Sequence, residues 1–105
     1  MTHYSILILS PIPVYKEDNA FHAMDLWARD LNTQTVVAAV HLICPVLERA
    51  DGPGVKIDPR IQVRADAGVD DNDLVKVVAK VDVVQLPGHA GWIGSVLARR
   101  VLRIA

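Results

Sequence analysis

Cysteine is almost absent from this chain: Cys44 is the only one among 105 residues. No disulfide can form within the chain, and a cysteine-rich zinc site is excluded. A single free thiol is typical of a reducing compartment, so we expect a cytoplasmic location. The first residues lack the basic start of a secretory signal, and no apolar run reaches the roughly 18 residues of a membrane helix. The sequence therefore predicts no membrane span.

Charge of one sign is also lacking, because 11 basic residues stand against 12 acidic ones and the net charge is -1. A chain without a basic excess has no electrostatic attraction for phosphate backbones, so we expect no nucleic-acid partner. The glycine-rich phosphate motifs GxGxxG and GxxxxGK[ST] are missing, which predicts no nucleotide cofactor. The four histidines fall on separate predicted elements without ligand spacing, so we assign no metal.

Apolar residues are abundant: they make up 51% of the chain, with 16 valines and 8 isoleucines in short runs. Such runs favour buried strands over helices. The length fits one domain, which we place at residues 1–105. Strands are predicted at residues 5–9, 35–43, 61–65 and 82–86. Between and after them, helices are predicted at 20–31, near 70–80 and from Gly91 onward, with a short helical turn at 46–50.

Strands that alternate with helices predict an α/β fold, a three-layer sandwich around a Rossmann-like, mostly parallel sheet. We expect Ile6–Leu9 and Val83–Leu86 to be adjacent central strands, because both runs are apolar throughout. Residues 61–65 alternate in polarity, which indicates a strand near the edge of the sheet.

The predicted first helix follows Asp18 and Asn19, either of which would serve as its N-cap. Its apolar face has helical spacing and consists of Ala20, Met24, Trp27 and Leu31, with Phe21 and Ala28 beside it. On its polar face, His22 and Asp25 are three residues apart and are expected to form a surface pair.

The candidate site lies where the loops 10–19 and 87–92 meet, because ligands of open α/β sheets bind at the carboxyl ends of the strands. His89 is either a general base or hydrogen-bond partner of a hydroxyl, or a solvated loop residue. Trp92 either stacks on a ligand ring or, as we favour, packs into the core. His41 is interpreted as a core or edge histidine, and Cys44 as a buried, inert thiol.

Several segments resemble the N-terminal half of GT-B glycosyltransferases of the family-4, nucleotide-sugar-dependent type. They are residues 5–13, 19–31 and 36–43, and above all Val-Asp-Val-Val-Gln-Leu-Pro-Gly-His at 81–89 with the following Trp-Ile-Gly-Ser-Val-Leu-Ala-Arg-Arg. Two positions depart from that family. Its Gly-Gly pair after the first strand is replaced by residues 16–20, which contain no glycine. Its histidine after the fourth strand falls at Pro87, two residues before His89.

The resemblance implies that the chain is the acceptor-side half of an enzyme that moves a sugar from a nucleotide-sugar donor to an acceptor hydroxyl. A second domain would bind the donor, so the chain alone is expected to be inactive. By position and chemistry rather than by the family pattern, we expect His89 to be the catalytic residue. We expect the polar and aromatic groups of the same two loops to bind the acceptor, namely Tyr15, Lys16, Asn19 and Trp92.

The alternative is a non-catalytic α/β binding or interaction module. Its C-terminal helix, with Trp92 and the cluster Arg99, Arg100 and Arg103, would then bind a protein partner. A reading frame that continues beyond Ala105 into a second α/β domain favours the glycosyltransferase, and a stop codon there favours the module.

Overall fold

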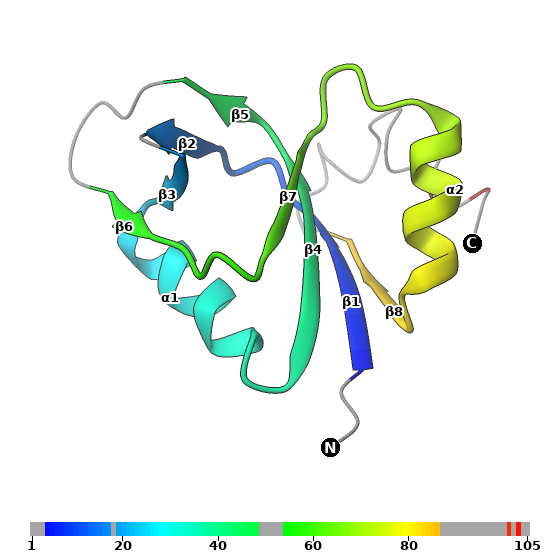
Figure 1. Ribbon diagram of the computed structural model, residues 1–105, viewed down its shortest axis with the longest axis horizontal. Coiled ribbons are helices and arrows are strands. Elements are labelled where there is room, and N and C mark those ends of the chain that lie inside the picture. The colour runs from blue at the N-terminus through cyan, green and yellow to red at the C-terminus, as the bar shows by residue number, and fades with distance from the viewer. Residues whose placement is uncertain (1–3, 18, 49–53, 87–100, 102, 104–105) are drawn as a thin grey trace.

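A parallel four-stranded sheet forms the centre of the molecule (Figure 1). The computed structural model describes residues 4–17, 19–48, 54–86, 101 and 103. The sheet consists of β1 (Tyr4–Leu9), β4 (Ala38–Cys44), β7 (Gln62–Ala65) and β8 (Val83–Gln85). Their spatial order is β7-β4-β1-β8, and each neighbouring pair is parallel. The α/β class and the mostly parallel sheet are thus as predicted.

If the four strands of this sheet are numbered 1 to 4 along the chain, their spatial order is 3-2-1-4. The first four strands of doubly wound folds have the same order. β1 pairs with β8 from Ile6 opposite Val83 to Ile8 opposite Gln85, so these two strands are neighbours as predicted. The prediction that both are central is wrong for the described residues, in which β8 ends the sheet and Val83 is 45% exposed. β7 lies at the opposite edge, as its alternating sequence indicated.

Each face of the sheet packs against its own apolar cluster, because successive side chains of a strand point to opposite faces. Ile6 and Ile8 belong to a first cluster with Ala28 and Leu31 of α1 (Asp25–Gln34). Leu7 and Leu9 belong to a second cluster. Its helical members come from α2 (Asp71–Lys80) and are Leu74 and Val77, and Val101 joins them. The continuous apolar run of β1 is therefore buried on both sides.

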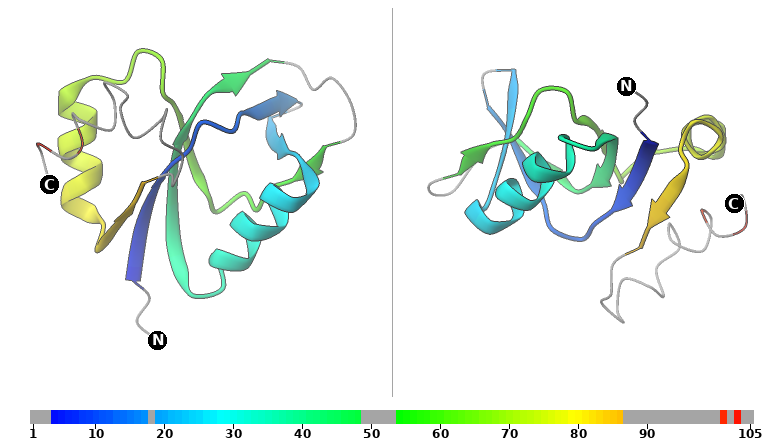
Figure 2. Two further views of the ribbon diagram at one scale, coloured as in Figure 1. Left: turned by 180° about the vertical axis from the view of Figure 1, so that it is seen from behind. Right: turned by 90° about the horizontal axis from the view of Figure 1, so that it is seen from below.

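A second, smaller sheet lies beside α1 and has the order β5-β2-β3-β6 (Figures 1 and 2). Its strands are β2 (Val14–Glu17), β3 (Ala20–Ala23), β5 (Val46–Leu47) and β6 (Val55–Lys56). The predicted helix over 20–31 is wrong in its first part, which is β3, and α1 begins at Asp25. The predicted helical turn at 46–50 is also wrong, because Val46 and Leu47 form β5.

Prolines explain why β1 and β4 end where they do and why the chain continues into a second sheet. Pro11, Pro13 and Pro45 have no backbone N–H and therefore cannot continue a ladder. β1 and β4 leave the first sheet at these residues, and their continuations pair again in parallel, with Val14 opposite Val46. β2 and β5 are therefore parallel to each other, as β1 and β4 are, whereas β3 is antiparallel to both β2 and β6.

α2 and the start of β1 are held by local polar contacts. The Asp70 carboxylate accepts a hydrogen bond from the Asp73 amide at 2.8 Å and so caps the N-terminus of α2. The Asp82 carboxylate accepts one from the Ser5 amide, also at 2.8 Å, and so ties the end of α2 to β1. In the described ranges, no helix is long and apolar enough to cross a membrane.

Candidate functional site

Successive strands are added on one side of β1 as far as β7, and β8 is added on the other side, so the order of strand addition reverses between β1 and β8. Open α/β sheets bind ligands at such a switch point. The carboxyl end of β1 leads into residues 10–13, and that of β8 leads toward residue 87. Ser10 is buried at this edge, with 2% of its surface exposed. The predicted loop 10–19 is much shorter in the structure, because β2 begins at Val14.

Every backbone N–H from residue 10 to residue 14 is either missing or already bonded. The Ser10 amide donates to the Ile43 carbonyl at 3.0 Å, and the Val14 amide donates to the Pro45 carbonyl at 3.0 Å. The Ile12 amide donates to the Ser10 hydroxyl oxygen at 3.0 Å. Positions 11 and 13 are prolines. A phosphate cradle requires several free N–H groups that point at the anion, and this turn offers none.

Three of the predicted site residues lie together on the β2–β3 hairpin. Tyr15 is half-buried on β2 opposite His22, and Lys16 is exposed opposite Phe21. Asn19 is in the turn with a φ of 65°, a left-handed conformation that asparagine tolerates better than most residues. Asn19 is therefore a turn residue and not a helix cap. His89 and Trp92 lie outside the described residues.

His22 and Asp25 were expected to pair with each other, but the structure shows a different arrangement. His22 is half-buried on β3, and its Nδ1 has no hydrogen-bond partner among the described residues. Asp25 instead pairs with Arg29 one turn along α1, with 2.8 Å between carboxylate oxygen and Nε. The predicted surface pair is wrong because residue 22 belongs to a strand.

His41 is buried in β4 and lies beside Arg64 of β7, with 3.4 Å between the Nδ1 and Nη1 atoms. Burial lowers the pKa of His41, and the positive charges of Arg64 and Lys80 lower it further. His41 thus lies buried inside a strand of the sheet, which agrees with the core or edge histidine expected from the sequence.

Cys44 is buried at the end of β4. Burial raises the pKa of its thiol to about 12, and the nearby Asp66 acts in the same direction. Cys44 is therefore buried as predicted, and because only the thiolate is nucleophilic, its lack of reactivity stays a prediction.

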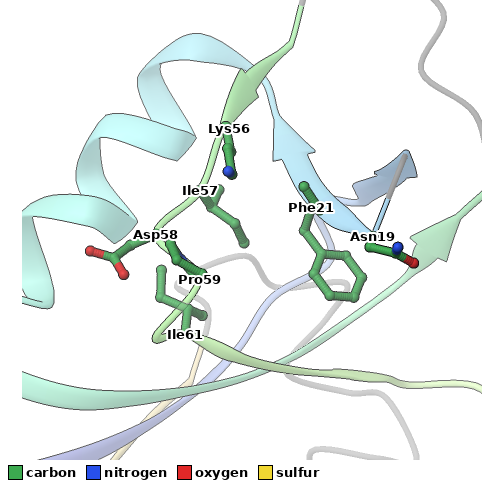
Figure 3. Close-up of a pocket in the computed structure, with 8 residues that line it drawn as sticks. Asn19, Phe21, Lys56, Ile57, Asp58, Pro59 and Ile61 are labelled. Carbon is green, nitrogen blue, oxygen red and sulfur yellow. The ribbon is translucent and has the colours of Figure 1, made fainter.

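A second candidate site was not foreseen from the sequence. A pocket of about 220 Å³ lies between the β2–β3 hairpin and the segment that connects β6 to β7 (Figure 3). Its lining residues are Asn19, Ala20, Phe21, Lys56, Ile57, Asp58, Pro59 and Ile61. The pocket was missed because it depends on β3 and β6, and the sequence pattern placed residues 20–23 in a helix.

Next to this pocket, Asp58 and Arg60 form a bidentate pair. One Asp58 oxygen accepts from the Arg60 Nε at 3.0 Å, and the other accepts from Nη2 at 2.7 Å. The Arg60 backbone amide adds a bond of 2.8 Å. Hydrogen bonds from Arg60 hold the pKa of Asp58 well below its usual range. Thr35 and Asn32 complete this network from the end of α1, so the turn 58–61 is anchored to the helix.

The C-terminal helix proposed to bind a partner lies mostly outside the described residues. Val101 is buried in the second cluster, and Arg103 is exposed. Comparison of the whole chain with known proteins gives no further assignment, since no protein-family model, curated protein or solved structure matches it.

Proposed function

We propose that this chain is the acceptor-side domain of a GT-B glycosyltransferase that uses a nucleotide-sugar donor. The observation that carries the proposal is the strand order β7-β4-β1-β8, which sets a switch point between β1 and β8. The two segments that follow these strands, 10–19 and 87–92, contain all the residues that loop position and side-chain chemistry assign to the acceptor site.

In the proposed reaction, an acceptor hydroxyl oxygen forms a bond to the anomeric carbon of the donor sugar. The bond from that carbon to the diphosphate oxygen breaks, and the nucleoside diphosphate leaves with the electron pair. His89 hydrogen-bonds the acceptor hydroxyl and accepts its proton as the new bond forms. Tyr15, Lys16, Asn19 and Trp92 position the acceptor.

The donor diphosphate is assigned to a second domain. The proline turn at residues 10–14 supports this division, because its N–H groups are missing or bonded. Glu17, which is exposed at the end of β2, adds a negative charge that disfavours a phosphate on this side. The domain alone is therefore proposed to bind the acceptor and to transfer no sugar.

We also propose that the sheet is the middle layer of a three-layer sandwich. The two apolar clusters support it, since α1 contributes to one and α2 to the other. The C-terminal helix, with Val101 in the second cluster, would complete the layer that contains α2.

The experiment that tests the proposed function is saturation-transfer NMR on the purified chain with a panel of mono- and disaccharides. We expect saturation of the protons of at least one saccharide, and its loss in the variant His89→Ala at unchanged far-UV circular dichroism. Absence of contact with any saccharide, or equal contact in the variant, would contradict the acceptor role of His89.

A further inference from the structure

The pocket beside the β2–β3 hairpin has two apolar walls that face each other (Figure 3). Phe21 of β3 forms one wall, and Ile57, Pro59 and Ile61 form the other. The Ile57 amide donates to the Phe21 carbonyl at 2.9 Å, so the backbones of the two walls are fixed relative to each other. The pocket is therefore formed before any ligand arrives.

The wall formed by Ile57 and Ile61 belongs to the hydrophobic core. Ile57 and Ile61 are 3% and 4% exposed and are members of the first cluster, against which Phe21 also packs. Apolar side chains with fixed neighbours keep one shape, because interiors are close-packed. A volume of about 220 Å³ is smaller than the roughly 300–1,000 Å³ of drug-sized sites. It suits a ligand with a single ring.

The charge at the pocket comes from Lys56. The other charged lining residue, Asp58, has both carboxylate oxygens occupied by Arg60. Lys56 is exposed and forms no ion pair within the described ranges. Lys56 therefore favours an anion on the ligand.

Few polar side chains are left to bind a ligand. Apart from Lys56 and the engaged Asp58, only Asn19 has a polar side chain among the lining residues. The carbonyls of Phe21 and Lys56 are bonded to the Ile57 amide and the Asn32 side chain. A hydroxyl-rich sugar would lose hydration at groups that find no partner here, which costs free energy. An apolar ring with one anionic group avoids that cost.

We propose that this pocket is a binding site for a small aromatic carboxylate, with the ring between Phe21 and the Ile57–Ile61 wall and the carboxylate toward Lys56. The site lies on the β3 and β6 side of the molecule, whereas β8 lies on the other side of β1 and β4 (Figure 1). It shares Asn19 with the proposed acceptor site but includes neither His89 nor Trp92, and its test does not depend on glycosyl transfer.

The test is a titration of the ¹⁵N-labelled full chain with benzoate, followed by heteronuclear NMR. A ligand of this size is expected to bind with a dissociation constant on the order of 1 mM. The amide signals of Ala20, Phe21 and residues 56–61 should shift in a saturable way. Benzyl alcohol, which has the ring but no charge, should bind roughly three- to tenfold more weakly.

Two variants test the role of the charge. Lys56→Gln should weaken benzoate roughly three- to tenfold and leave benzyl alcohol unchanged. Lys76→Gln, which makes the same charge change on α2, should bind benzoate like the parent chain.

Three outcomes would overturn the proposal. The first is the absence of a saturable shift at the pocket amides up to roughly tenfold above the expected constant. The second is equal weakening by Lys56→Gln and Lys76→Gln, which would indicate a general charge effect. The third is binding of glucose at these amides more tightly than benzoate.

Discussion

The backbone amide of Val14 donates to the carbonyl oxygen of Pro45 at 3.0 Å, just beyond the point where β1 and β4 leave the first sheet. This bond joins the two strands again after their proline breaks. It also uses a donor at the position where many nucleotide-binding α/β domains present free amides to a phosphate. The second sheet thus begins where such a loop would present its free amides.

Nucleotides are therefore expected to bind weakly or not at all. Calorimetric titration of the chain with UDP, GDP and ADP sugars should give no dissociation constant in the micromolar range. A micromolar constant for any of them would show that the chain binds the donor diphosphate, and the division of labour proposed above would be wrong.

Asn19 provides a prediction about stability. Its φ of 65° is accessible to glycine, whereas alanine is strained there by about 1–2 kcal/mol. Asn19→Ala should lower the free energy of unfolding by about 1 kcal/mol, and Asn19→Gly should change it by less than about 0.5 kcal/mol. Urea denaturation followed by circular dichroism measures both, and equal losses in the two variants would contradict the turn assignment.

The buried His41 predicts a dependence of stability on pH. Its folded pKa is lowered from the ordinary 6.5, so at mildly acidic pH the unfolded chain binds the proton better than the folded one. The free energy of unfolding should therefore be full above about pH 6.5 and fall as the pH drops from there toward the folded pKa. His41→Gln should flatten this part of the profile, measured by urea denaturation between about pH 5 and pH 8.

The variant Arg64→Gln tests whether the charge of Arg64 contributes to the lowered pKa of His41. Removing this cation relieves part of the repulsion on protonated His41, and the profile should become shallower without disappearing, because burial is the larger cause. An unchanged profile in both variants would mean that other groups dominate the titration in this range.

Cys44 should react slowly with thiol reagents in the folded chain. With a pKa of about 12 and a buried side chain, almost no accessible thiolate exists near neutral pH. A colorimetric thiol assay should show slow labelling under native conditions and one rapidly reacting thiol per chain in urea. Rapid labelling of the native protein would show that the end of β4 is open to solvent.

The elements that were predicted correctly are those whose own residues, without distant partners, indicate whether they are buried and where they begin. β1 is a continuous apolar run, and both of its faces are covered. α2 begins at an aspartate whose side chain caps the helix, and its apolar residues Leu74 and Val77 have helical spacing. These strands and this helix need little information from distant parts of the chain.

The second sheet was missed because its strands are short and depend on distant partners. Residues 20–23 join two neighbours, with Phe21 opposite Lys16 and His22 opposite Lys56. The apolar spacing from Ala20 to Leu31 fits a helix equally well, and tertiary pairing decided against it. The available signal was Asp18-Asn19, two residues between two short runs, which is typical of a hairpin turn.

The candidate site was therefore predicted only in part. The switch point follows from strand order, which the alternation of apolar runs already indicated. The pocket with Phe21 and Lys56 could not be predicted, because it exists only once β3 has paired with β6.

The proposal that this domain supplies the acceptor side of a glycosyltransferase is tested most directly by a transfer assay. The open reading frame that contains these 105 residues is expressed in full, beside the 105-residue chain alone and the full protein with His89→Ala. With a panel of nucleotide sugars and acceptors, we expect turnover by the full protein, none by the chain alone, and a loss of roughly tenfold to a thousandfold in the variant. Robust turnover by the chain alone, or a reading frame that ends at Ala105 and transfers no sugar, would contradict it.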